Sequence, residues 1–437
     1  MIKTIASKAK LKLWSWRQSR PQRVLLLPLF PLVAIAGWLA KSRSRVTDAR
    51  NSNIFILHFG AIGDALMATP AIRLLHQQYP SAEIDVLTAS RSALDIFSRN
   101  PRIKRASFLQ QYDAGNIKER FHEKRSLWRD RLLLFFLYPT LVIRLLADSY
   151  HIGIALGPLH EGATFSNILF DLVGIPLRVG ALGAHPEVLT HAADPKIAKL
   201  HWVDFYREII KTLIAEPCDI DDSLDYAVSE TERARAGEFL RTHRIQYDQA
   251  IAVIHPGGNL FINSKRWAPE KFAEVADSLD NRFSSVVITG SADEKEVAEQ
   301  VKQAMRMRGV NAAGELTFGE TAAVLKRAAL LITNDTGILH LADAVGVPQI
   351  ISIFGPTDPK KIAPRNNRNR IVSANLECAP CIDFDAGDPS KRCWRTIKEE
   401  CLGTITVKQV LGAIEPDLPV TRELEYDSSL ALVAGHR

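Results

Sequence analysis

The sequence has no excess of positive charge outside its first 50 residues. Those residues hold eleven Lys and Arg against one acid, Asp48, whereas the rest of the chain holds 44 Lys and Arg against 48 Asp and Glu. The formal net charge of +6 therefore belongs to the leader, residues 1–50, and the remainder carries −4. A body without a basic surplus argues against a nucleic-acid-binding protein, so we expect no nucleic-acid partner.

Two further signatures are missing. The glycine loop after the first apolar run is not G-x-G-x-x-G, so it gives little support to a dinucleotide-binding function. The leader has no convincing small-residue cleavage site, which argues against a removable signal peptide. Its uncharged run, Val24–Ala40, would span about 25 Å as a helix, at the short limit for crossing a bilayer.

The leader instead has the composition of a membrane-surface anchor. Cations bracket Val24–Ala40, and Pro28 and Pro31 weaken any straight helix within it. Three tryptophans suit the lipid interface: Trp14, Trp16 and Trp38. We expect this run to lie in, or dip into, an anionic cytoplasmic leaflet. A true membrane span and a solvated basic tail are the alternatives.

A chain of 437 residues fits two domains of ordinary size, and a hydrophobic content of 46% is enough for two cores. Acidic, irregular sequence between residues 215 and 226 suggests the boundary. We predict an N-terminal Rossmann-like domain over residues 51–225, a C-terminal one over 226–415, and a tail over 416–437.

The first domain opens on a strand–loop–helix–strand pattern. Asn53–Phe59 reads as a buried strand, Gly60-Ala61-Ile62-Gly63-Asp64 as a loop, Ala65–Gln78 as a helix, and Glu83–Thr88 as the next strand. Glycine loops at the carboxyl ends of parallel strands are where open α/β sheets bind ligands. Asp64 can simply complement the helix dipole, but an acid in such a loop is equally a candidate general base.

The segment Leu132–Leu146 is strongly apolar, broken only by Pro139 and Arg144. It predicts a helix that packs on the sheet, with Pro139 kinking or splitting it. A second membrane-contacting surface is the alternative.

The second domain repeats the rhythm. Ala250–Ile254 is predicted as a strand that runs into His255-Pro256-Gly257-Gly258, and Ser285–Thr289 as a strand that leads to Gly290 and Glu294. Two α/β domains with such loops imply a ligand site in the cleft between them.

The stretch Leu330–Pro359 is central to the second domain. An apolar strand leads into Asn334-Asp335-Thr336-Gly337, and a helix follows that Gly346-Val347-Pro348 stops. A helix N-terminus carries unsatisfied N–H groups and about half a positive charge, which suits a phosphate. The motif alone could merely cap a helix. His340 lies one turn further on, where its ring can reach a ligand held at that end, which favours the functional interpretation.

Taken in order and spacing from Asn53 to Ile414, these motifs resemble glycosyltransferase family 9, the bacterial ADP-heptose:lipopolysaccharide heptosyltransferases. The segments that carry the resemblance are Gly60-Ala61-Ile62-Gly63-Asp64 with Thr69-Pro70-Ala71, His255-Pro256-Gly257-Gly258, Lys265-Arg266-Trp267, Gly290 with Glu294, Asn334-Asp335-Thr336-Gly337 with His340, and Phe354-Gly355-Pro356-Thr357-Asp358-Pro359. The resemblance implies a GT-B fold: two facing doubly wound domains, with the final helix crossing back to the first. It also implies inverting, metal-independent transfer of heptose from ADP-heptose to a lipid-linked saccharide.

The resemblance carries roles for individual residues. Asp64 matches the catalytic base, Lys265 a cation on the phosphates, and Glu294 a residue that binds the nucleoside. His255 and Gly258 match the neighbouring strand-end loop of the nucleotide-sugar site. The diphosphate site is matched by Asp335, Thr336, Gly337 and His340.

Two features differ from the family's usual pattern. On the acceptor-side segment, which includes Gly60 and Gly63, His58 stands where relatives usually have Arg or Lys. The basic leader is an addition, since most relatives begin at the first strand. Both features bear on the acceptor, which need not be the usual inner-core sugar of lipopolysaccharide.

Four of the five cysteines cluster near the C-terminus: Cys378, Cys381, Cys393 and Cys401. Their spacing could hold a tetrahedral zinc ion, but reduced thiols in a cytosolic protein are the simpler interpretation. We expect no metal or other cofactor in the reaction.

The sequence therefore predicts a glycosyltransferase at the cytoplasmic face of a bacterial inner membrane. Its expected partners are ADP-heptose or a related nucleotide sugar, a lipid-linked saccharide and the lipid surface. A transferase for another nucleotide sugar and envelope acceptor, a sugar-nucleotide epimerase and a non-enzymatic binding module are the alternatives, in decreasing order of support.

Overall fold

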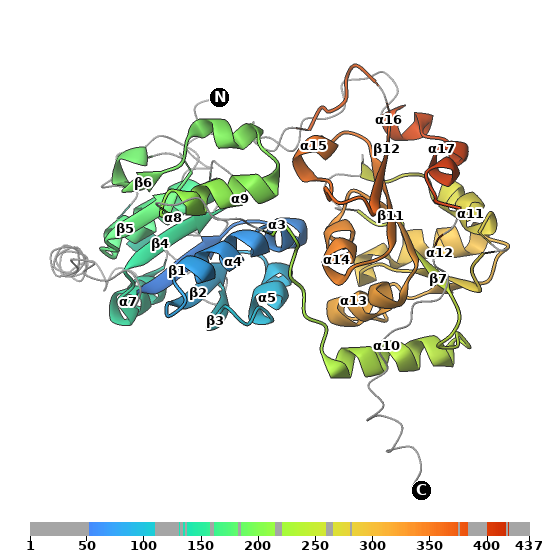
Figure 1. Cartoon of the computed structure of the whole chain (residues 1–437), viewed down its shortest axis with the longest axis horizontal. Coiled ribbons are helices and arrows are strands. Elements are labelled where there is room, and N and C mark those ends of the chain that lie inside the picture. The colour runs from blue at the N-terminus through green and yellow to red at the C-terminus, as the bar shows by residue number, and fades with distance from the viewer. Residues whose placement is uncertain are drawn as a thin grey trace, which may run out of the picture. The chain divides into compact units, whose positions relative to one another are not determined.

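The structure is a computed structural model that describes residues 52–109, 131, 134–135, 138–157, 161–181, 185–214, 221–258, 265–279, 282–374, 376–382, 400–416 and 418. The chain divides into two compact units (Figure 1). The first unit comprises residues up to Ala61 together with Pro70–Asp221, and the second comprises Ile62–Thr69 together with residues from Asp222 onward. The short segment Ile62–Thr69, which includes Asp64, thus belongs with the second unit although it directly follows the first strand of the chain.

The first unit is built on a six-stranded parallel sheet. Its strands are β1 (Asn53–His58), β2 (Glu83–Thr88), β3 (Arg105–Phe108), β4 (Ile152–Leu156), β5 (Leu177–Gly180) and β6 (His191–Ala192). They lie in the order β3-β2-β1-β4-β5-β6. The chain therefore reverses its direction across the sheet between β1 and β4, and the carboxyl ends of these two central strands form the switch point where doubly wound sheets bind ligands.

Helices cover this sheet because each buries one apolar stripe on it. They are α5 (Arg91–Ser98), α7 (Pro139–Asp148), α8 (Glu161–Leu172) and α9 (Trp202–Lys211), with short 3-10 turns at Pro186–Val188 and Pro195–Lys199. Helix α7 begins at Pro139, which is tolerated in a first helical turn because its missing N–H has no partner there anyway. Leu141, Val142 and Leu145 of α7 are buried in the core. For its described part, the predicted packing of Leu132–Leu146 on the sheet is confirmed.

The second unit repeats the architecture with different residues. Its strands are β7 (Ile251–His255), β8 (Ser285–Ile288), β9 (Gly309–Asn311), β10 (Leu330–Asn334), β11 (Gln349–Phe354) and β12 (Asn369–Ser373). The order β12-β11-β10-β7-β8-β9 is that of the first sheet, read from the other edge, and all pairings are parallel. The switch point of this sheet therefore lies between β7 and β10.

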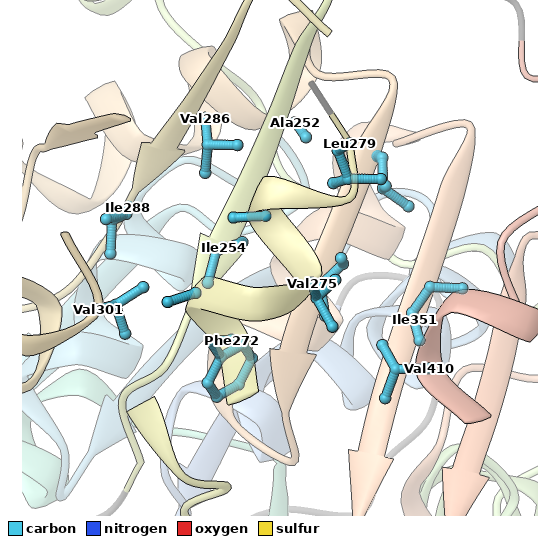
Figure 2. Packing of buried hydrophobic residues seen from close by; sticks show 14 of the residues in the cluster. Ala252, Ile254, Phe272, Val275, Leu279, Val286, Ile288, Val301, Ile351 and Val410 are labelled. Carbon is cyan, nitrogen blue, oxygen red and sulfur yellow. The ribbon is translucent and has the colours of Figure 1, made fainter. Parts of the chain in front are cut away.

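The helices of the second unit lie on both sides of its sheet (Figure 1). They are α10 (Glu230–Thr242), α11 (Pro269–Asp277), α12 (Lys295–Ala304), α13 (Phe318–Arg327), α14 (Gly337–Val345), α15 (Pro359–Ile362), α16 (Glu400–Thr404) and α17 (Val407–Gly412), with a 3-10 turn at Ala292–Glu294. Figure 2 shows Phe272 and Val275 of α11 over the sheet, where Ile254 lies. Val410 of α17 belongs to the same core as Ile351 of β11, so the last described helices pack on the second unit. The implied crossing of the final helix to the first domain stays a prediction.

The predicted single helix Ala65–Gln78 is wrong. The structure has α3 (Ile62–Met67) and α4 (Thr69–Gln78), which are separated at Ala68. The break follows from Pro70, which has no N–H to donate to the carbonyl oxygen of Leu66. The hydroxyl of Thr69 donates to that oxygen instead, at 2.7 Å.

Most central strands follow the predicted spans closely, and Glu83–Thr88 and Gln349–Phe354 agree to the residue. Two parallel-sheet α/β units are thus confirmed. The short strands β3, β6, β9 and β12 were not predicted. The leader, with Val24–Ala40, lies outside the described residues. None of the helices in the described part of the chain has the length and hydropathy that a membrane crossing needs.

Candidate nucleotide-sugar site

The carboxyl ends of β7 and β10 bring three loops of the second unit together. His255 ends β7 and leads into Pro256-Gly257-Gly258, while Asn334 ends β10 and leads into the N-terminus of α14. The strands are adjacent and parallel, with Thr333 opposite His255. The third loop, Lys265-Arg266-Trp267, precedes α11. Most of the predicted nucleotide-sugar residues lie on these loops.

Asn334 ties the three loops to one another. Its side chain is fully buried and uses both amide hydrogens, donating to the carbonyl oxygens of Pro256 at 2.9 Å and Gly257 at 3.0 Å. Its Oδ1 accepts from the backbone N–H of Trp267 at 3.1 Å. A buried amide with three good partners fixes the relative positions of the backbones that it joins.

Next to it, Asp335 holds the side chain of Lys265. The carboxylate Oδ2 accepts from Lys265 Nζ at 2.6 Å and from Thr357 Oγ1 at 2.7 Å. Both ions of the pair are nearly buried, with side-chain exposures of 10% for Lys265 and 7% for Asp335. Removing two charges from water is costly, so such a pair persists only with close geometry and an extra hydrogen bond, which Thr357 supplies. Lys265 and Asp335 are therefore joined directly, as the sequence did not reveal.

Glu294 engages the backbone of the β7 loop. Its Oε1 accepts from the N–H of Gly258 at 2.8 Å, and its Oε2 accepts from the N–H and the hydroxyl of Ser291 at 2.8 and 3.0 Å. Burial by itself raises the pKa of this carboxyl, but nearby His255 and the hydrogen bonds outweigh burial and lower the pKa. A Cβ at Gly257 would lie 2.2 Å from Oε1, so only glycine lets the carboxylate come so close.

His255 is buried beside this carboxylate. Its Nδ1 lies 3.1 Å from the carbonyl oxygen of Thr289, which can only accept, so Nδ1 carries the hydrogen. Burial is the largest influence on its pKa and lowers it, because a charged imidazolium loses its hydration there. His255 therefore takes up a proton only at a lower pH than an exposed histidine does.

The N-terminus of α14 carries the other predicted phosphate residues. Thr336 is its N-cap and makes no side-chain capping bond, and Gly337 is the first helical residue. His340 follows one turn later and is buried. The helix ends as predicted, since Gly346 adopts a left-handed conformation with φ 79° that favours glycine.

Segment Ile62–Thr69 packs against this helix end. A Cβ at Gly337 would lie 2.7 Å from Cγ2 of Ile62, and a Cβ at Gly63 would lie 2.7 Å from Cδ2 of His340. The two glycines therefore permit a close approach of α3 and α14. Asp64 follows Gly63 directly in the first turn of α3. The structure thus places Asp64, the predicted base, in the same unit as the predicted phosphate residues, and in a helix rather than in the predicted loop.

His58 and Gly60 belong to the first unit. His58 is the last residue of β1 rather than a loop residue, and it is fully buried. Its ring packs edge-on against Phe97, with centroids 5.0 Å apart, and lies near Tyr206. Gly60 follows the strand and is partly exposed. The position of His58 is that of a core side chain of the first unit.

The cysteine cluster does not form a metal site among the described residues. No group of three or more His, Cys, Asp or Glu in that part of the chain is placed to hold a metal ion. Cys378, Cys381 and Cys401 form no disulfide within the described part of the chain. Cys393, the fourth predicted ligand, lies outside the described residues.

Four site residues had no assigned role in the sequence analysis: Asn334, Thr357, Ser291 and Arg266. Arg266 donates to the carbonyl oxygen of Gly258 at 2.8 Å, on the peptide next to the one that Glu294 holds. Apart from Ser291, each stands within a motif that carried the resemblance, which was the available signal. The bonds of Asn334 and Thr357 to Trp267, Pro256, Gly257 and Asp335 join residues 22 to 78 positions apart in the sequence, so the motifs alone did not show what these two hold.

Comparison with known proteins gives a family for this arrangement. The chain matches glycosyltransferase family 9 (heptosyltransferase) over residues 141–389. It is 26% identical over 336 residues to lipooligosaccharide heptosyltransferase 2 of Haemophilus influenzae, an alignment that covers 73% of this chain and 88% of that protein.

Solved structures show the same fold. A family 9 glycosyltransferase from Veillonella parvula superposes with a TM-score of 0.65 at 21% identity, covering 83% of this chain and 96% of the other. The ADP-heptose LPS heptosyltransferase II of Escherichia coli superposes with a TM-score of 0.58 at 20% identity, covering 83% and 97%.

Proposed function

Because this chain belongs to glycosyltransferase family 9 and is a glycosyltransferase, we propose that it transfers heptose from ADP-heptose to a lipopolysaccharide core or similar glycolipid. The observation that carries this proposal is the network at the carboxyl ends of β7 and β10, which places a buried cation, Lys265, beside the N-terminus of a helix. Both features suit a nucleoside diphosphate. The names of the similar proteins, heptosyltransferases for lipooligosaccharide and ADP-heptose, support the choice of sugar and acceptor. We assign the two units to a GT-B fold.

On the donor side, we assign Lys265 and the first turn of α14, with Thr336, Gly337 and His340, to the diphosphate. Asp335 is an anion and would repel phosphate, so its role in this proposal is to hold the ammonium of Lys265 in place. We assign Glu294 to the nucleoside, beside the loop of His255 and Gly258. As the bond to the sugar breaks, the helix N–H groups and the ammonium stabilise the charge that develops on the departing ADP.

On the acceptor side, we assign general-base catalysis to Asp64 in the first turn of α3, with Gly60 and Gly63 on the same acceptor-side segment. The Asp64 carboxylate takes the proton of the acceptor hydroxyl while the hydroxyl oxygen attacks the anomeric carbon. A new C–O bond forms opposite the bond to ADP, and the bond to ADP breaks with its electron pair. Attack from the opposite face inverts the configuration at that carbon.

The reaction in this proposal needs no metal ion. Lys265 and the α14 N-terminus supply the positive charge that Mg²⁺ supplies to diphosphates in other transferases. Turnover in excess EDTA is therefore expected to equal the untreated rate. A loss of turnover that Mg²⁺ or Mn²⁺ restores would contradict this part of the proposal.

The leader supports a place at the cytoplasmic face of the inner membrane. Its net charge of +10 attracts anionic headgroups, and Val24–Ala40 supplies apolar burial. Deleting residues 1–50 is expected to release the protein from the membrane fraction and to leave ADP binding intact. A truncated protein that stays with the membrane would disprove this assignment of the anchor.

The donor assignment is tested by incubating the full chain with ADP-heptose, UDP-glucose and ADP-glucose and an acceptor glycolipid, and by following sugar transfer. Protection against heat by each donor gives a second readout, since a ligand that binds only the folded protein raises its melting temperature. Transfer from ADP-heptose is the expected result. Transfer from another donor alone would favour the second candidate, a family 9 transferase for a different sugar. Because the chain is a glycosyltransferase, the epimerase and binding-module alternatives no longer stand.

A further inference from the structure

The Asn334 side chain has a hydrogen-bond pattern that other side chains cannot reproduce there. Two of its neighbours, the carbonyl oxygens of Pro256 and Gly257, demand donors, and the third, the N–H of Trp267, demands an acceptor. Only an amide offers two donors and one acceptor in that compact shape. An aspartate in its place would set its oxygens against both carbonyl oxygens, and an aliphatic residue would leave three buried backbone groups without this partner.

The residues that Asn334 holds are those that carry the donor site. Trp267 lies two residues after Lys265, whose ammonium is bound by Asp335, the residue next to Asn334. The segment Lys265–Trp267 is therefore attached to the end of β10 at two points, by backbone through Asn334 and by side chain through Asp335. Gly257, held by Asn334, is also where a side chain would collide with the Glu294 carboxylate.

We infer that Asn334 is a positioning residue for nucleotide-sugar binding, which fixes Lys265 and the Pro256–Gly258 loop relative to the N-terminus of α14. This inference rests on the proposed function and deepens it. Asn334 itself does not contact the donor: its amide hydrogens and its oxygen are occupied by backbone groups. Because Asn334 already orders the two loops, donor binding loses less conformational entropy than it would with mobile loops. A misplacement of about 1 Å in such a site can cost about 100-fold.

A matched control exists on an edge strand of the same sheet. Asn369, the first residue of β12, is also buried and hydrogen-bonded, accepting from Ser352 Oγ at 2.8 Å and donating to the carbonyl oxygen of Pro364 at 3.1 Å. It lies at the amino end of its strand, whereas Asn334 lies at a carboxyl end. Asn369→Ala therefore removes a comparable buried amide without touching the donor loops.

The test compares the full-length wild type, Asn334→Ala and Asn369→Ala by calorimetric titration with ADP and by melting temperature. We expect Asn334→Ala to weaken ADP binding and to raise the donor KM by about 10- to 100-fold, with the acceptor KM unchanged. Both variants are expected to lower the melting temperature by similar amounts, because each removes a buried, hydrogen-bonded amide. Asn369→Ala is nevertheless expected to bind ADP as the wild type does. Equal ADP affinity in the two variants would overturn the inference.

A second variant keeps the inference testable if Asn334→Ala does not fold. In Asn334→Asp, a protonated carboxyl restores one donor, so ADP affinity relative to wild type is expected to improve as the pH falls from about 8 to about 6. A relative affinity that does not change with pH would count against the positioning role.

Failure of the proposed function gives a different result. If the wild type binds no ADP, the nucleotide-sugar proposal fails, and hydrogen exchange at the Trp267 amide then decides the positioning role. Faster exchange in Asn334→Ala than in Asn369→Ala would still show that Asn334 orders this loop, whereas equal protection would overturn it.

Discussion

At the ends of their central strands, the two units use different chemistry on the same topology. In the first unit, the N–H of Phe59 donates to the carbonyl oxygen of Leu156 at 3.1 Å, and a Cβ at Gly157 would lie 2.9 Å from the carbonyl oxygen of Phe59. This backbone hydrogen bond joins the ends of β1 and β4, next to the aromatic packing of His58. In the second unit, Asn334 and the Lys265–Asp335 pair join the loops through polar side chains.

The difference shows that one strand order can carry two kinds of strand-end loop. The strand order 3-2-1-4-5-6 positions loops at a switch point in each unit, but the residues on those loops decide what can bind. In the second unit, a buried ion pair and a buried amide hold the loops in one arrangement. In the proposed function, such an arrangement suits a donor of fixed geometry. The first unit instead joins its central strand ends by a backbone hydrogen bond beside Gly157. Three predictions test what the polar side chains of the second unit do.

The largest effect is expected for Asp64, the proposed base. Asp64→Asn keeps the size of the side chain and removes the proton acceptor, so transfer is expected to fall by about 10²- to 10⁴-fold while ADP affinity stays unchanged. Glu270→Gln is the control, because Glu270 is also an acid in the first turn of a helix of the second unit. Transfer at the wild-type rate in Asp64→Asn would refute the assignment.

The next largest effect concerns the buried ion pair. Asp335→Asn leaves the Lys265 ammonium buried without its counter-ion, which typically costs about 3–5 kcal/mol in the free energy of unfolding. Arg370 and Glu415 of the same unit form a pair with side-chain exposures of 43% and 52%, and Glu415→Gln is expected to cost less than about 1 kcal/mol. Denaturant unfolding of both variants measures the contrast. Similar costs would show that burial does not distinguish the two pairs.

The smallest effect is a pH dependence from His255. Its pKa in the folded protein lies below the ordinary value of 6.5, so only the unfolded chain takes up a proton as the pH falls through that value. The contribution of His255 to the free energy of unfolding is therefore fully present above about pH 6.5. It declines below that pH, with a slope of up to about 1.4 kcal/mol per pH unit. His255→Gln is expected to flatten this slope in melting experiments between about pH 7 and about pH 5. An unchanged slope would show that other groups produce it.

The fold was predictable wherever a strand is buried on both faces. Gln349–Phe354 is fully buried in β11, and its continuous apolar run predicted the strand to the residue. The edge strands β3, β6 and β9 were missed because they are short and have a neighbour on one side only. The break between α3 and α4 was missed although Pro70 gave the signal.

For the candidate site, the sequence named residues but not their partners. Lys265 and Asp335 were each assigned to the phosphates, and the structure shows them bound to each other. Glu294 was assigned to the nucleoside, and the structure shows its carboxylate on the backbone of Gly258 and Ser291. The assigned roles remain proposals, now with a geometry against which they can be tested.

By itself, the sequence determined the two parallel α/β units and the family. Hydrophobic period, glycine loops and motif order depend only on the order of residues along the chain, so they can be recognised without the structure. Only the tertiary structure decided that Ile62–Thr69 packs with the second unit, and that Asn334 reaches Pro256, 78 residues away in the sequence. Hydrogen bonds over such separations depend on where parallel strands end in space. Strand register fixes those positions, and register is set by packing across the whole sheet rather than by any one segment.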